Sequence, residues 1–109
     1  MKEIEKADLG TQGVDEIIDL EQFSKEDKKP PKNQKYRIKV DREKFVVNEE
    51  CLTGREILEL AGKVPPEQFQ LRQKLRGGQV EKIGLEEKVD LTVPGIEKFI
   101  TIPLDQTEG

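Results

Sequence analysis

The chain has 109 residues and a formal net charge of −4, a length that fits one domain. Charged residues make up 39% and hydrophobic residues 33%, so part of the chain is expected to lie outside any core. Histidine is absent and there is one cysteine, which argues against histidine-based catalysis, histidine-containing zinc sites and an intrachain disulfide. We therefore expect no enzyme activity, no cofactor or metal and a reducing, cytoplasmic location.

The first 34 residues read as an acidic tail. Residues 1–27 hold nine acids and three lysines, whereas residues 28–35 hold four lysines and no acid. Pro30 and Pro31 interrupt helices and central strands, so they mark a Lys/Pro linker. We predict a tail over 1–34, a domain over 35–103 and a C-terminal tail over 104–109. Because the domain is nearly neutral, because no apolar run approaches roughly 20 residues and because no secretory signal is visible, we expect no nucleic-acid or membrane partner.

A hydrophobic motif lies within the acidic tail, at residues 14–23. Its apolar side chains, Val14, Ile17, Ile18, Leu20 and Phe23, lie among acids. The pattern fits a strand that adds to a sheet edge, an amphipathic helix or a solvated spacer. Arg72 and Lys74, with Arg37 and Lys39, are expected on exposed strand faces that suit an acidic ligand. We therefore consider docking of the tail on its own domain or, if the linker is stiff, on a neighbouring copy in open fibres or rings.

The domain reads as strands around one helix. Alternating residues predict a hairpin of strands 36–40 and 44–48, and the capping box from Thr53 to Glu56 opens a helix over 54–61. Strands 68–75 and 79–83 flank a turn at Gly77-Gly78, a linking segment covers 85–91, and the last strand is 97–102. The expected core is Tyr36, Ile38, Val40, Phe45, Val47, Ile57, Leu58, Ala61, Phe69, Leu71, Val80, Ile83, Val89, Leu91 and Phe99. This order predicts an α+β fold with one helix on one sheet face.

Several motifs resemble those of the bacterial multiubiquitin-type family of ubiquitin-like proteins. They are the strand YRIKVD (36–41), the helix TGREILELAG (53–62), the turn that follows Leu71, VDL (89–91) and the approach GIEKF (95–99) to the last strand. The resemblance covers roughly residues 35–103. It implies a β-grasp fold with a mixed sheet of four to five strands and one main helix. Motif 14–23 is similar to acidic-hydrophobic peptides that bind small ubiquitin-like modifiers.

The resemblance also implies a function and partners. Such proteins are modifiers, handed from an activating enzyme to a conjugating enzyme and then to target proteins, with a deubiquitinase-like protease nearby and a link to antiviral defence. The conjugated residue would be Gly109, although a terminal glycine also occurs by chance. Leu75-Arg76-Gly77-Gly78 looks like a ubiquitin tail, but its place between alternating runs predicts a hairpin turn. Without a histidine partner, Cys51 is expected to be a loop or core residue and not a nucleophile.

Overall fold

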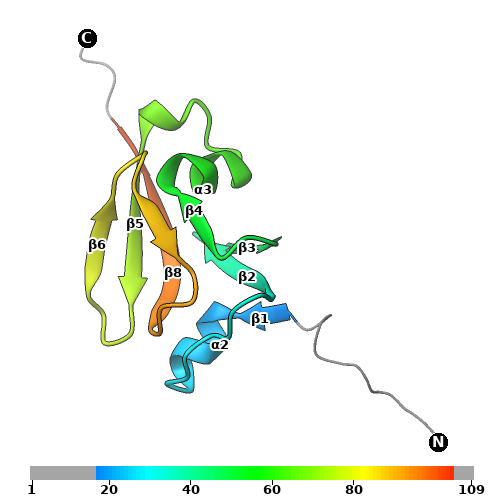
Figure 1. The fold of residues 1–109 in the computed structure, drawn as a ribbon. Helices are drawn as coiled ribbons and strands as arrows, with labels where there is room; N and C mark the ends of the chain where they lie inside the picture. Colours follow the sequence, from blue (N-terminus) through cyan, green and yellow to red (C-terminus); the bar gives the residue numbers. More distant parts are fainter. Residues whose placement is uncertain (1–16, 105–109) are drawn as a thin grey trace, which may run out of the picture.

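The computed structural model describes residues 17–104, and Figure 1 shows how their helices and strands are arranged. The elements in chain order are β1 (Ile17–Asp19), α2 (Leu20–Lys25), β2 (Lys35–Val40), β3 (Glu43–Val47), β4 (Cys51–Thr53), α3 (Gly54–Leu60), the 3₁₀ turn η2 (Pro66–Gln68), β5 (Phe69–Leu75), β6 (Val80–Ile83), β7 (Lys88–Asp90) and β8 (Ile96–Pro103).

The main sheet has the strand order β3-β2-β8-β5-β6, with β1 as a further strand beside β2. The central pair, β2 and β8, is parallel, whereas β3, β5 and β6 run antiparallel to their neighbours. This mixed sheet with one main helix, α3, confirms the predicted α+β ubiquitin-like β-grasp fold. The sheet has one strand more than expected, because β1 comes from the predicted tail.

Helix α3 begins at the predicted Gly54 and ends at Leu60, one residue before the predicted end. The Thr53 hydroxyl accepts a hydrogen bond from Glu56 N at 3.1 Å, and the Glu56 carboxylate accepts one from Thr53 N at 2.8 Å. This capping box satisfies backbone donors that the first helical turn leaves free. Gly62, with φ +77°, follows the helix end and takes the left-handed conformation that stops it. The buried side chains of Ile57 and Leu58 anchor the helix in the core.

Tight turns set the strand register. Gly77 and Gly78 both have φ +94° and join β5 to β6, so the predicted hairpin turn at Leu75-Arg76-Gly77-Gly78 is confirmed. The β2–β3 turn holds Asp41 at φ 56°. The Asp41 carboxylate accepts hydrogen bonds from Thr101 N at 2.9 Å and Thr101 Oγ1 at 2.6 Å, which ties this turn to β8.

Two short strands were not predicted. The segment expected to be a linker at 85–91 contains β7, which pairs with β4 in a separate two-stranded sheet. Each strand has three residues, too few to produce a readable alternation of apolar and polar side chains.

No helix within residues 17–104 is long and apolar enough to cross a membrane.

The core agrees with the prediction at most positions and differs at informative ones. Val80 was predicted to be buried, but it is 43% exposed. It pairs with the outward Lys74, and it cannot share a face with Ile83 because strand faces alternate with a period of two. Buried residues that the prediction omitted include Ile18 and Leu20, both from the predicted tail. The buried hydrophobic side chains are Ile18, Leu20, Tyr36, Ile38, Val40, Val47, Leu52, Ile57, Leu58, Leu71, Ile83, Val89, Leu91, Ile96 and Phe99.

Candidate functional site

Strand β2 pairs with three other strands of the sheet. Strand β3 pairs with β2 from Tyr36 to Val40 and so occupies one edge of it. The other edge is shared, because β1 pairs with residues 35–37 while β8 pairs with β2 only through Val40 and Phe99. Helix α2 packs against both β8 and β2, at the far end of the sheet from α3 in Figure 1. We call this place, where β1 and α2 meet β2 and β8, the β2–β8 junction.

The docking segment, residues 17–25, is made of β1 and α2. Ile18 and Leu20 are 1% and 2% exposed and belong to the core, and Phe23 packs against it. Ile17 is 36% exposed, and Val14 lies outside the described residues. Residues 17–23 of the motif therefore form a strand and then the start of a helix, so two of the three interpretations apply to successive parts of the described motif. The folded unit extends beyond the boundary predicted at residue 35.

Asp19 marks the change from strand to helix. Its Oδ1 accepts a hydrogen bond from Gln22 N at 3.2 Å, so the side chain caps the N-terminus of α2. The first turn of α2 carries Glu21, an acid that suits the positive end of the helix. Asp19 has an extended backbone conformation and is both the last residue of β1 and the N-cap of α2, so no loop separates the two elements.

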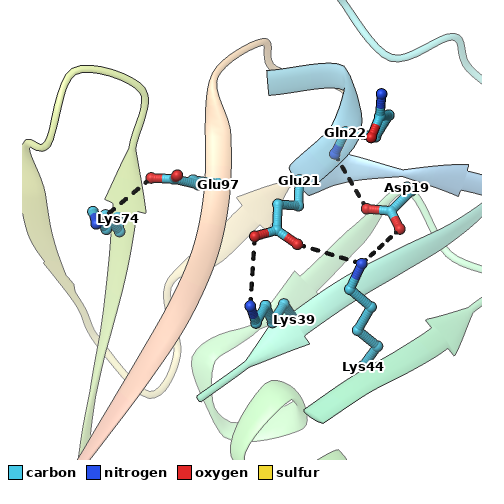
Figure 2. Close-up of polar contacts among 7 residues, drawn as sticks. All are labelled: Asp19, Glu21, Gln22, Lys39, Lys44, Lys74 and Glu97. Atoms are coloured by element: carbon cyan, nitrogen blue, oxygen red, sulfur yellow. Dashed lines mark hydrogen bonds and ion pairs between the residues drawn. The ribbon is translucent and has the colours of Figure 1, made fainter. Parts of the chain in front are cut away.

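The same acids join the docking segment to the sheet, as Figure 2 shows. Lys44 Nζ lies 2.9 Å from Asp19 Oδ2 and 3.3 Å from Glu21 Oε1, so it bridges both carboxylates. Lys39 Nζ lies 3.5 Å from Glu21 Oε2, and an Arg37 guanidinium nitrogen lies 3.6 Å from Asp19 Oδ2. We call Asp19, Glu21, Arg37, Lys39 and Lys44 the junction ion cluster.

These contacts shift the pKa values of the cluster. Burial alone would raise the pKa of Asp19, but hydrogen bonds from Lys44 and the Gln22 amide outweigh it and lower the pKa. The pKa of Glu21 is also lowered, because Lys44 and Lys39 outweigh the effect of burial. The hydrogen bond to Asp19 raises the pKa of Lys44. Docking therefore favours the charged form of every one of these three groups.

A hinge, residues 26–34, returns the chain from α2 to β2. Pro30 is buried, and the Tyr36 hydroxyl donates a hydrogen bond to Pro31 O at 2.6 Å. Lys29 Nζ donates to Thr92 O at 3.2 Å, and Asn33 N donates to Glu50 Oε2 at 2.6 Å. These contacts hold the predicted linker against the domain, with the docking segment on its own chain.

The predicted basic face only partly meets the acidic motif. Arg37 and Lys39 contact the docking segment, as their alternation on β2 suggests. Arg72 and Lys74 lie on β5, and within the described residues their polar contacts are with Gln70 and Glu97. Lys44 was not among the predicted docking residues. Its position next to Lys39 depends on the β2–β3 register, which the sequence of β3 alone does not reveal.

The C-terminal end of β8 is the last described part of the chain before the predicted conjugation residue, Gly109. Ile102 and Leu104 are 37% and 39% exposed, and Leu104 N donates a hydrogen bond to Gln68 O at 2.8 Å. The chain thus leaves the sheet on the surface beside η2. Gly109, the predicted conjugation residue, lies outside the described residues. Cys51 is exposed on β4 and is not the loop or core residue that was expected.

Within residues 17–104, no cluster of acidic or cysteine side chains could hold a metal ion. The sequence model of the family described as Multiubiquitin matches residues 36–103, which run from the second residue of β2 to the end of β8 and exclude the docking segment. Neither the curated proteins nor the solved structures that were compared gave a match. The family match spans more than half of the chain, and it covers the part that forms the ubiquitin-like fold. The chain therefore belongs to the multiubiquitin family.

Proposed function

We propose that this chain is a bacterial ubiquitin-like modifier of the cytoplasm, conjugated to target proteins through the carboxylate of Gly109. The supporting observation is the surface exit of the chain at the end of β8, where Ile102 and Leu104 are exposed. An activating enzyme needs an extended tail that reaches its active site while the folded domain stays outside. Glycine suits that role because it has no side chain to block a narrow channel.

In this proposal the chain is the substrate and the partner enzymes supply the chemistry. The Gly109 carboxylate attacks the α-phosphorus of ATP, which gives an acyl-adenylate and releases pyrophosphate. A cysteine thiolate of the activating or conjugating enzyme displaces AMP and forms a thioester. A target amine or hydroxyl then displaces the thiolate and forms an amide or ester. A deubiquitinase-like protease would hydrolyse that bond, and the cycle would serve antiviral defence.

Reconstitution tests the proposal directly. The chain is incubated with ATP and with the activating and conjugating enzymes that this proposal places beside its gene, and the products are analysed by mass spectrometry. We expect adducts in which Gly109 is joined to an enzyme or target, and no adduct without ATP. A variant lacking Gly109 should lose them, whereas Lys82→Ala, at an exposed position of β6, is the matched control and should keep them. Adducts that persist without Gly109 would reject this conjugation site.

A second candidate function is non-covalent assembly, in which the docking segment of one copy binds a neighbour and builds oligomers or filaments. The observation that favours it is that the segment outside the family match contributes buried side chains to the domain. Light scattering over a series of protein concentrations tests this function. A mass that rises with concentration supports assembly, and a monomer at every concentration contradicts it.

A further inference from the structure

The docking segment and its binding site are separate parts of one chain. Ile18 and Leu20 are buried against a domain that the family match defines without them. The junction ion cluster joins Asp19 and Glu21 of the segment to cations of β2 and β3. An identical site exists on every other copy, so a segment that leaves its own domain would recover the same strand pairing, burial and ion pairs on a second copy. Only the conformation of the hinge and its contacts with the domain would differ.

The closed hinge has a conformational cost at both ends. Asp27, just after α2, has φ 59°, and Asn33, just before β2, has φ 62°. These left-handed conformations are unfavourable for residues with a side chain, although Asp and Asn tolerate them better than most. Between them lie Pro30 and Pro31, which favour an extended chain. In an extended hinge Asp27 and Asn33 would both leave the left-handed conformation, and the docking segment would move away from its own domain.

The competition between the two arrangements depends on concentration. A segment on a short tether acts at an effective concentration of about millimolar, so the closed form dominates in dilute solution. At millimolar protein the segment of a second copy is about as concentrated at the junction as the tethered segment. The loss of the two left-handed conformations in the hinge then favours exchange. The contacts of the closed hinge, including the hydrogen bond from Tyr36 to Pro31, act in the opposite direction.

We propose that the β2–β8 junction binds the docking segment of a second copy of this chain by exchange of β1 and α2 across an opened hinge. This inference rests on the second candidate function and names its binding site and partner. It is independent of Gly109, so failure of conjugation in the reconstitution leaves it untouched. Reciprocal exchange gives a closed dimer, and one-way exchange gives an open chain of copies.

Cross-linking in mixed samples tests the exchange. In a Cys51→Ser background, one copy carries Ile17→Cys and the other carries Lys35→Cys. These two positions are register partners in the β1–β2 pair, and both are at the surface. Neighbouring strands lie about 4.8 Å apart, within reach of a disulfide or a short bis-maleimide. The two proteins are mixed at millimolar concentration, incubated and cross-linked, and the products are resolved by mass.

Exchange predicts a mixed dimer that is at least about tenfold more abundant than the dimers formed by either variant alone. A single chain with both cysteines should cross-link within itself in dilute solution, which confirms that the two positions meet. If that intrachain product forms but the mixed dimer stays at the level of the single-variant controls, exchange is excluded.

Hinge variants provide a second, independent measurement. Asp27→Gly with Asn33→Gly favours the left-handed conformation and should hold the hinge closed. Asp27→Val with Asn33→Val penalises that conformation at two residues, so the equilibrium constant for exchange should rise by about 30-fold or more per opened hinge relative to the glycine pair. Equal yields of mixed dimer from the two pairs would overturn the role assigned to the hinge. Circular dichroism checks that both pairs are folded.

Discussion

Ile18 and Tyr36 are register partners in the parallel β1–β2 pair, and both side chains are almost completely buried. A residue of the predicted tail thus lies beside the first core residue of the predicted domain. The contact makes the docking segment part of the fold and not an appendage to it.

Ile18→Ala is expected to lower the free energy of unfolding by about 2–5 kcal/mol, because it removes buried methyl and methylene groups and leaves a cavity. Ile17→Ala is the matched control, since Ile17 is at the surface and its loss should cost less than about 0.5 kcal/mol. Urea unfolding of both variants measures the difference. Equal stability of the two variants would show that β1 does not contribute to the core in solution.

Acid should weaken the docking of the segment. Asp19 and Glu21 have pKa values lowered below their ordinary 3.8 and 4.5 in the folded protein. A carboxylate with a lowered folded pKa adds stability that is fully present above its unfolded pKa and is lost as the pH falls through the folded pKa. The free energy of unfolding should therefore fall as the pH drops below about 4.5, which urea titrations at several pH values measure.

The double variant Asp19→Asn with Glu21→Gln separates this effect from other carboxylates. Asparagine still caps α2, so the helix start is preserved while both charges are removed. The variant should lose about 0.2–1 kcal/mol per partly exposed ion pair at pH 7 and fall less steeply in acid. Asp90 and Glu67, whose pKa values are also lowered, keep part of the slope in the variant. If the free energy of unfolding of the variant falls as steeply with pH as that of the natural chain, Asp19 and Glu21 are not the source of the acid dependence.

The sequence predicts some elements far better than others, for physical reasons. Helix α3 is predictable because its capping box, apolar periodicity and final glycine are all local signals. The docking segment was left open among three interpretations because a three-residue strand and a six-residue helix give weak local signals. Its place follows from the single residue pair between β2 and β8, a non-local property of the sheet. The sequence also does not predict the ion pairs of Lys44 with Asp19 and Glu21, because they depend on non-local strand pairing.

Gly54 begins α3 in close contact with a neighbouring loop. A Cβ added there would clash with the backbone carbonyl oxygen of Gly84. Alanine improves helix propensity by about 1 kcal/mol, but this clash with backbone should outweigh it, giving a net loss of about 1–3 kcal/mol for Gly54→Ala. Gly84→Ala is the control, because its Cβ would approach other atoms only to 3.7 Å. The thermal unfolding temperature of Gly54→Ala should be lower than that of Gly84→Ala. A stabilised Gly54→Ala would contradict the predicted clash.

Tyr36 is the single tyrosine of the chain, so its phenolate absorbance reports on one site. Burial raises the pKa of Tyr36 above its usual 10, with a smaller contribution in the same direction from Glu50 and Asp90, while a backbone hydrogen bond from Gln34 opposes it. We expect the alkaline absorbance change to occur above pH 10, and stability to fall as the pH rises through 10, because only the unfolded chain releases this proton readily.

Ile18→Ala shortens the buried side chain at the register partner of Tyr36 and should move that titration back toward the ordinary value. Ile17→Ala, at the surface of the same strand, should leave it in place. If the phenolate titrates at the ordinary pKa in the natural chain and in both variants, Tyr36 is open to water and the docking segment does not cover it in solution. A shift confined to Ile18→Ala ties the environment of Tyr36 to the seating of β1.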